Sequence, residues 1–287
     1  MKNSNKATLG GGEKKMATPK TGVEPATTKP TGEVTTEPTG EVTTKPTGEV
    51  KEELLEHPIV LGRGSDGKMV EATLGELKST LISGLPGSGK SSLLRHIIDQ
   101  SCDQAQVLCV DLKRVSYLDF RGRENFNLIT DINRCAELFQ DISVLLERRF
   151  QKMEQLGTDK CDAKRILIVV DEFAELSGSM DQNTAEQIRR ILSLGRACNI
   201  TMVVATQQAS RRILTGALLD LFCSKIGLRQ NSVYASKIAI GRAGCEHLPD
   251  FTGLYLNHYG YMTQFGLMPP LGEEVEEDDP DDFLKWE

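Results

Sequence analysis

A glycine-rich segment that ends in lysine and serine has the clearest chemistry in this sequence. Its pattern, G-x-x-x-x-G-K-S, lets consecutive backbone N–H groups point inward around an anion. The lysine can then reach the outer phosphates of a nucleotide, and the serine hydroxyl can bind Mg²⁺. The segment therefore predicts a phosphate-binding loop for ATP and Mg²⁺. The candidate nucleotide contacts are Gly84, Leu85, Pro86, Gly87, Ser88, Gly89, Lys90, Ser91 and Ser92, with Ser91 also a metal ligand.

Two acidic residues form a second candidate site. Asp171 and Glu172 follow the apolar run Ile166–Val170, at the carboxyl end of a predicted strand, where open parallel sheets bind ligands. Asp171 is expected to hold Mg²⁺ through water, and Glu172 to act as the general base that activates a water molecule. The alternative is that both residues only cap a helix beginning at Phe173.

A third candidate follows the next predicted strand, which ends in Ala205-Thr-Gln-Gln208. A polar side chain at this place can contact both the γ-phosphate and the attacking water. Gln207 is therefore the predicted sensor residue, and a plain surface turn is the alternative.

The elements that position these residues alternate between strand and helix. The predicted strands 166–170 and 202–205 are apolar at every position. This composition is typical of parallel strands that are covered on both faces. The sequence predicts an α/β fold of the P-loop NTPase type (RecA-like, additional-strand class), with a mainly parallel sheet between helices and a hairpin at each end. The strand and helix at 106–155 separate the phosphate loop from Asp171, which is typical of the additional-strand class. The predicted order is strand 79–83, helix 90–101, strand 106–111, helix 131–155, strand 165–171, helix 183–197, strand 200–206, helix 212–221, strand 223–229 and helix 231–240.

Composition divides the 287 residues into three parts. Residues 1–52 contain three TT(K/E)PTGEV units with one large apolar residue each, so we expect a disordered arm. Residues 53–272 form the predicted ATPase domain. Residues 273–287 form an acidic tail with nine acidic residues and one basic residue, whose charge of -8 accounts for the chain's net charge of -7. The seven cysteines form no C-x-x-C pair, which favours reduced thiols in a cytoplasmic protein. No apolar run is long enough for a membrane span.

The motifs together resemble the motor domain of the FtsK/SpoIIIE DNA translocases, of the HerA/FtsK-like class, over about 57–262. Two elements depart from the family pattern. Leu112 stands where the family's Asp-Pro-Lys element has proline, and Gln208-Ala-Ser210 stands where the family has Arg-Pro-Ser. The elements that carry the resemblance are the phosphate loop, Asp111-Leu-Lys113, Val169-Val-Asp-Glu-Phe-Ala174, Gly195-Arg-Ala197, Ala205-Thr-Gln207 and Leu214-Thr-Gly216.

The resemblance implies a homo-oligomeric ring, with a hexamer expected, that hydrolyses ATP and moves double-stranded DNA without reading its sequence. Arg196 resembles the arginine that reaches the nucleotide of a neighbouring subunit, and a surface salt bridge near a helix end is the alternative. Candidate phosphate contacts for DNA are Arg114, Arg121, Arg123, Arg211 and Arg212, although such residues are often only a solvated face.

The chain shows neither the amino-terminal membrane spans nor the winged-helix module of long family members, and so resembles small FtsK-like proteins of mobile elements, including conjugative ATPases. A membrane-protein partner could bind the arm or the tail and recruit the chain from the cytoplasm. Two other functions stay open: a ring ATPase that moves secreted proteins, and an adaptor module switched by nucleotide.

Overall fold

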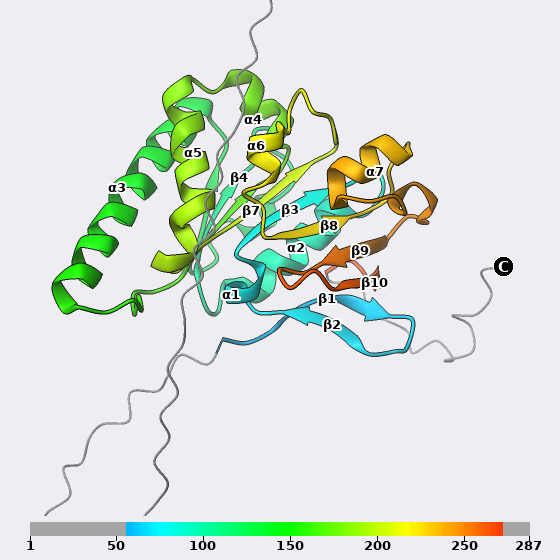
Figure 1. The fold of residues 1–287 in the computed structure, drawn as a ribbon, viewed down its shortest axis with the longest axis horizontal. Coiled ribbons are helices and arrows are strands. Elements are labelled where there is room, and N and C mark those ends of the chain that lie inside the picture. Colours follow the sequence, from blue (N-terminus) through cyan, green and yellow to red (C-terminus); the bar gives the residue numbers. More distant parts are fainter. Residues whose placement is uncertain (1–55, 272–287) are drawn as a thin grey trace, which may run out of the picture. The chain divides into compact units, whose positions relative to one another are not determined.

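One mixed sheet organises the part of the chain that the computed structural model describes, residues 56–271. The predicted arm at 1–52 and the predicted tail at 273–287 lie outside these residues. Ten strands within the described range form the sheet in the order β2-β1-β10-β9-β8-β3-β7-β6-β4-β5 (Figure 1). Their bounds are β1 (Ile59–Gly64), β2 (Met69–Ala72), β3 (Ser79–Ser83), β4 (Gln106–Val110), β5 (Phe126–Ile129), β6 (Ile166–Val170), β7 (Ile200–Thr206), β8 (Ser224–Gly227), β9 (Thr252–Leu256) and β10 (Met262–Leu267).

The strands from β5 to β8 in this order run parallel to one another. The others, β9, β10, β1 and β2, extend the sheet in antiparallel pairs, and they include the two predicted hairpins. The prediction of an α/β fold with a mainly parallel sheet is therefore confirmed.

The strand β7 lies between β3 and β6 in space. Residue Ser79 of β3 pairs with Met202, and Ile166 of β6 pairs with Ile200. The predicted 106–111 strand, observed as β4, lies between the phosphate loop and Asp171 in sequence but not in space. It pairs with the side of β6 that faces away from β7. The additional strand between the phosphate-loop strand and the acidic strand is thus β7.

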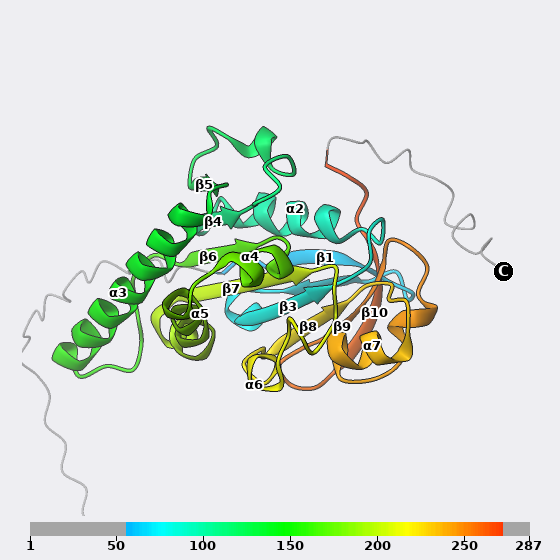
Figure 2. The ribbon, with the colours of Figure 1, turned by 90° about the horizontal axis from the view of Figure 1, so that it is seen from above.

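Helices cover both faces of the sheet (Figure 2). One face carries α2, and the other carries α3, α5, α6 and α7. Short 3₁₀ helices, η1 (Leu118–Phe120), η2 (Gly195–Cys198) and η3 (Cys245–His247), join some of the elements. The α-helices are α1 (Leu74–Leu77), α2 (Lys90–Ser101), α3 (Ile132–Leu156), α4 (Phe173–Ser179), α5 (Gln182–Leu194), α6 (Gly216–Leu219) and α7 (Val233–Ile240).

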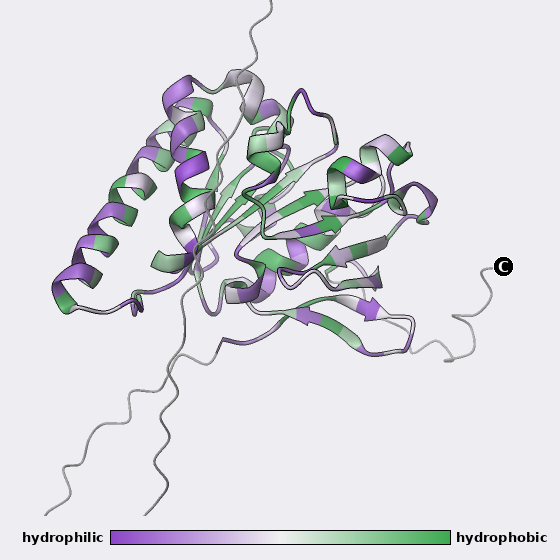
Figure 3. Cartoon of the chain, viewed as in Figure 1, coloured by the Kyte–Doolittle hydropathy of each residue, from purple (hydrophilic) through white to green (hydrophobic). Residues whose placement is uncertain are grey.

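The apolar strand β6 shows why the central strands lack polar alternation. Its residues Ile166, Ile168 and Val170 pack into the core beneath α3 and α5. Its other two residues, Leu167 and Val169, pack into the core beneath α2. Both faces are buried, so every position is apolar, and the central strands are correspondingly hydrophobic in Figure 3.

The long helix α3 has clear start and stop signals. The Asp131 side chain accepts hydrogen bonds from the N–H groups of Asn133 and Arg134, at 2.9 and 3.2 Å, and Gly157 ends the helix at φ +62°. Buried residues such as Phe139 and Leu146 place its apolar face in the core of the domain.

Three predictions differ from the structure. The predicted helix 212–221 is wrong except for α6, which covers only Gly216–Leu219. The helix starts late because Thr215 caps it: the Thr215 side chain accepts a hydrogen bond from the Leu218 N–H at 3.3 Å. The predicted helix 183–197 ends at Leu194 and continues as η2. The strand β5 was absent from the prediction, and it is held by its parallel pairing with β4.

Candidate active site

The candidate residues meet at the carboxyl edge of the parallel strands. The strand β3 leads into the phosphate loop, β6 into Asp171 and Glu172, and β7 into Gln207. These three strands are parallel neighbours, so their carboxyl ends share one edge of the sheet. The structure therefore brings together the predicted phosphate, metal and base residues.

The phosphate loop is tied to its neighbours by its own backbone. The Leu85 N–H donates to the Arg229 carbonyl at 3.0 Å, and the Ser88 hydroxyl donates to the Leu85 carbonyl at 2.7 Å. Gly89, at φ +93°, precedes the first residue of α2, Lys90. This left-handed conformation suits glycine, and it starts the helix directly behind the loop. The N-terminal N–H groups of α2 therefore face the anion site.

Lys90 forms an ion pair with Oδ1 of Asp171, and both residues are buried. The other oxygen, Oδ2 of Asp171, accepts a hydrogen bond from the Tyr117 hydroxyl at 3.2 Å. Burial, together with the negative charge of Asp171, raises the pKa of Tyr117 well above its usual value, so the hydroxyl keeps its proton and remains a donor. Sequence reasoning missed Tyr117, because it lies alone in a loop without a recognisable pattern.

Glu172 is held by three polar groups around its buried carboxylate. The Thr206 hydroxyl donates to Oε1 at 3.0 Å. The Gln207 N–H lies 3.2 and 3.3 Å from the two oxygens, and the Lys113 ammonium lies 3.5 Å from Oε2. Glu172 has φ +71°, a strained value of the kind that collects at functional sites. Its side chain makes no capping hydrogen bond to α4, so the alternative role as a helix cap has no support.

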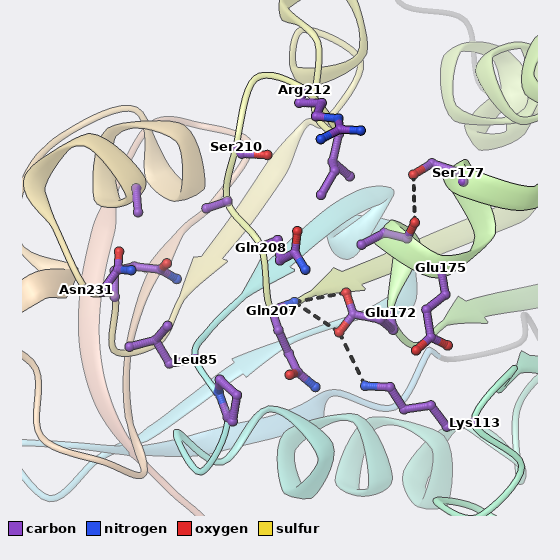
Figure 4. Close-up of a pocket in the computed structure, with 17 residues that line it drawn as sticks. Leu85, Lys113, Glu172, Glu175, Ser177, Gln207, Gln208, Ser210, Arg212 and Asn231 are labelled. Carbon is purple, nitrogen blue, oxygen red and sulfur yellow. Dashed lines mark hydrogen bonds and ion pairs between the residues drawn. The ribbon is translucent and has the colours of Figure 1, made fainter.

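A cleft of about 960 Å³ opens beside these groups (Figure 4). Glu172, Gln207 and Lys113 line it, as does Arg212. The Gln207 side chain lies in the cleft, while its backbone N–H points to Glu172 (Figure 4). Thr206 belongs to the same sequence motif as Gln207. Its contact with the Glu172 carboxylate depends on the direction of its side chain, which the sequence did not indicate.

Arg196 lies at the opposite edge of the sheet. It belongs to η2, which precedes β7, whereas the phosphate site follows the far ends of β3 and β7. A strand of seven residues spans roughly 20 Å at about 3.3 Å per residue. Within the described range Arg196 has no ion pair with a carboxylate, so the salt-bridge alternative has no support. Lys78, the residue before β3, has a lowered pKa. Its burial is the larger cause, and the positive charge of Arg196 is the second.

The arginines proposed as DNA contacts differ in their exposure and in whether their side chains already bind another residue. The guanidinium of Arg123 pairs with Asp99 and donates to the Asp99 carbonyl at 2.9 Å, so it mainly fixes a loop against α2. Arg114, Arg121 and Arg211 are exposed. Arg212 is exposed as well and lines the cleft beside Glu172.

The residues present fit a magnesium nucleotide. The left-handed Gly89, the buried Lys90 and the N-terminus of α2 form an anion cradle. The Ser91 hydroxyl, which is exposed in the first turn of α2, and the Asp171 carboxylate supply the hard oxygen ligands that Mg²⁺ prefers. When bound, Mg²⁺ would neutralise negative charge on the phosphates.

The chain resembles known proteins in both sequence and structure. The AAA domain family matches residues 76–214. DNA translocase FtsK of Tropheryma whipplei is 28% identical over 221 residues, which cover 67% of this chain and 30% of that protein. DNA translocase FtsK of Chlorobaculum tepidum is 25% identical over 224 residues, or 69% of this chain and 28% of that protein. The chain thus spans less than a third of the length of these relatives.

Two solved structures share the fold. The pCW3 conjugation coupling protein TcpA, in a monomer form with ATPγS, has a TM-score of 0.68 and 23% identity, covering 74% of this chain and 66% of that chain. The cytoplasmic domain of the Thermomonospora curvata type VII secretion ATPase EccC has a TM-score of 0.65 and 22% identity, covering 77% of this chain and 30% of that chain.

The phosphate loop and the paired carboxylates on this sheet define an ATPase of the P-loop class. The sequence relatives narrow the class further. The chain contains an FtsK-like motor domain. Among the described helices, none has the length and apolar character needed to cross a membrane.

Proposed function

We propose that the chain is an ATP-driven translocase of double-stranded DNA that works as a ring of identical subunits. The observation that carries the hydrolytic part is the buried Glu172 carboxylate, oriented by Thr206 and Gln207 at the cleft beside the phosphate loop. DNA as the moved substrate is supported by the FtsK relatives, which are named DNA translocases.

Each residue of the site has a defined role in the proposal. Lys90 and the loop N–H groups bind the phosphates, while Ser91 and Asp171 hold the metal. Glu172 accepts a proton from the attacking water, as hydrolysis requires. Gln207 contacts the water or the terminal phosphate in this proposal, which is supported by its side chain lining the same cleft.

Arg196 acts on the nucleotide of a neighbouring copy. The length of β7 keeps Arg196 about 20 Å from its own phosphate loop, so the arginine can reach a phosphate only across a subunit boundary. An arginine supplied in this way contributes on the order of 10³ to 10⁵ in rate. The site is incomplete without a second subunit, which supports a ring, and we propose a hexamer.

Steady-state ATP hydrolysis tests the proposal. Long linear duplex DNA should stimulate hydrolysis at low salt, and the stimulation should fade at high salt because phosphate contacts release counterions. Glu172→Gln should abolish hydrolysis at both salt concentrations. Glu175→Gln is the matched control, since this exposed carboxylate lines the same cleft and its residue is linked to Glu172 by a backbone hydrogen bond, from the Glu175 N–H to the Glu172 carbonyl at 3.1 Å, which the substitution keeps. Hydrolysis indifferent to duplex would contradict a DNA motor.

Mixed rings test the role of Arg196. Arg196→Ala and Glu172→Gln should each be inactive alone, whereas a mixture should regain hydrolysis. In the mixture, an intact Glu172 faces an intact Arg196 across some boundaries. Arg189→Ala is the control, because Arg189 is exposed and its ion pair among residues 56–271 is with Glu186 on the same helix, α5. No recovery in the mixture, with both variants folded, would contradict action across subunits.

A second candidate function is the movement of secreted proteins. It is favoured by the fold shared with the type VII secretion ATPase EccC, over 77% of this chain. In that case turnover would respond to an exported polypeptide and be unaffected by duplex DNA. We place the DNA motor first because the sequence relatives named FtsK cover two thirds of the chain.

The setting proposed for the motor is DNA transfer or segregation, including conjugative transfer, in the cytoplasm. The fold shared with the conjugation coupling protein TcpA supports this setting. Recruitment to a membrane partner would involve the arm at 1–52 or the tail at 273–287.

A further inference from the structure

An exposed aromatic side chain is fixed against the phosphate loop. The Phe251 N–H donates a hydrogen bond to the Ser88 carbonyl at 3.2 Å, and the Phe251 carbonyl accepts one from the Leu267 N–H at 2.8 Å. The residue is thereby bound to the loop on one side and to β10 on the other. The residue is nevertheless 51% exposed.

The backbone of Phe251 is strained at this point. Its φ of +60° lies in the left-handed region, which a bulky side chain rarely adopts. Such outliers cluster at ligand sites, because the surrounding structure has to impose them. The two backbone hydrogen bonds impose this one, and they direct an aromatic ring to the rim of the loop.

The ring packs closely on the start of α2. A β-carbon on Gly89 would lie 2.9 Å from Cδ1 of Phe251 and 2.4 Å from Cδ1 of Leu267. Only glycine leaves room for this contact. Phe251 therefore borders the loop where the N–H groups of α2 face the phosphates.

The order of the strands places Phe251 and Glu172 on opposite sides of the loop. Phe251 precedes β9, on the side of β3 that carries β8. Glu172 follows β6, on the side of β3 that carries β7. A nucleotide whose terminal phosphate points to Glu172 extends its nucleoside end toward Phe251.

We propose that the exposed face of Phe251 stacks on the base of the nucleotide whose phosphates the loop holds. This inference rests on the proposed nucleotide binding and adds the residue that receives the base. A stacking platform accepts any base, but a purine offers the larger π-face and should bind more tightly than a pyrimidine.

Exposed tyrosines elsewhere provide a contrast. Tyr259 and Tyr261, which are 69% and 71% exposed, lie in the turn between β9 and β10. That turn is at the amino edge of the parallel strands, since Leu256 pairs with Lys225 near the start of β8. Neither ring is near the phosphate loop, so Tyr261→Ala is a matched control for the loss of an exposed aromatic side chain.

The decisive variant is Phe251→Gly, because glycine accepts φ +60° without strain and removes the whole aromatic side chain. Dissociation constants should be measured for ATP and for inorganic tripolyphosphate. The variant should bind ATP about tenfold more weakly than the wild type, as expected for the loss of one base–aromatic stack. Its affinity for tripolyphosphate should be unchanged, and Tyr261→Ala should bind both ligands like the wild type.

The outcomes separate the two proposals. Equal ATP affinity in the wild type and Phe251→Gly overturns the stacking inference alone. Equal weakening for ATP and tripolyphosphate also overturns it, because the loop itself would then be disturbed. No binding of either ligand by the wild type contradicts the proposed nucleotide site as well.

Fluorescence gives an independent measurement. The chain has one tryptophan, Trp286, so a Trp286→Phe background leaves Phe251→Trp as the single reporter. ATP should quench this reporter and tripolyphosphate should not. CTP should quench it less than ATP does at equal concentrations. Equal quenching by tripolyphosphate and ATP would overturn stacking on the base.

Discussion

Lys90 and Asp171 form an ion pair whose side chains are only 4% and 3% exposed. The pair joins the phosphate loop to the end of β6, so the lysine proposed to bind phosphate and the carboxylate proposed to bind metal are paired with each other in this structure. The Lys113–Glu172 pair in the same cleft differs, because the Lys113 side chain is 34% exposed.

Lys90→Ala should therefore cost more stability than Lys113→Ala. Removing Lys90 leaves the Asp171 charge buried without a cation, which costs about 3–5 kcal/mol. Removing Lys113 costs about 0–1 kcal/mol, because the pair is partly exposed and Glu172 keeps its other donors. Urea denaturation without nucleotide measures both values. The reverse order would contradict the buried ion pair.

The Thr206 hydroxyl should be needed to orient Glu172. In Thr206→Val the carboxylate loses a donor and the Gln208 N–H loses its 3.1 Å acceptor, so stability should fall by about 1–3 kcal/mol. The kcat for ATP should fall as well, with little change in nucleotide affinity.

Thr206→Ser is the control for this effect, because it keeps the hydroxyl. It should restore both stability and kcat to near the wild-type values. A kcat for Thr206→Val equal to that of the wild type would show that the hydroxyl does not orient the base.

Gly89→Ala should impair nucleotide binding. A β-carbon there would lie 2.4 Å from Leu267 and 2.9 Å from Phe251, and φ +93° is unfavourable for alanine. The start of α2 would have to shift, so both stability and ATP affinity should fall, the latter by more than tenfold. Gly178→Ala in α4 is the matched control, because no atom lies within 4 Å of its added carbon. Full ATP affinity in Gly89→Ala would contradict the close contact.

The sequence was sufficient to predict the central strands and the residues at their carboxyl ends. The run Ile166–Val170 is apolar at every position, so it indicated a strand buried on both faces, and the acidic pair after it was placed correctly. The strand β5 has no such run: the two residues at its centre, Asn127 and Leu128, are exposed and half-buried, and its pairing with β4 is a long-range contact. Local sequence carries little information about such a pairing.

The candidate site shows the same limit. The phosphate loop was predictable because its glycines and Lys90 have fixed spacing. Tyr117 and Phe251 carry no motif, since their places beside Asp171 and Ser88 depend on how distant loops fold back to the sheet. The Gly-Arg-Ala motif gave no sign of where Arg196 lies, and only the fold shows that it is at the edge of the sheet opposite the phosphate loop.

Asp111→Asn should lower stability and disturb the loop that presents Lys113. Asp111 is fully buried and uses its two oxygens separately: Oδ1 accepts from the Lys113 N–H at 3.0 Å, and Oδ2 from the Ser116 N–H at 2.9 Å. Asparagine has one acceptor oxygen, so a buried N–H loses its partner at a cost of about 1–3 kcal/mol. Asp119→Asn is the control, because Asp119 is largely exposed and its pair with Arg95 should contribute at most about 1 kcal/mol. Urea denaturation of both variants checks the difference, and equal losses would mean that the Asp111 turn is not what fixes this loop.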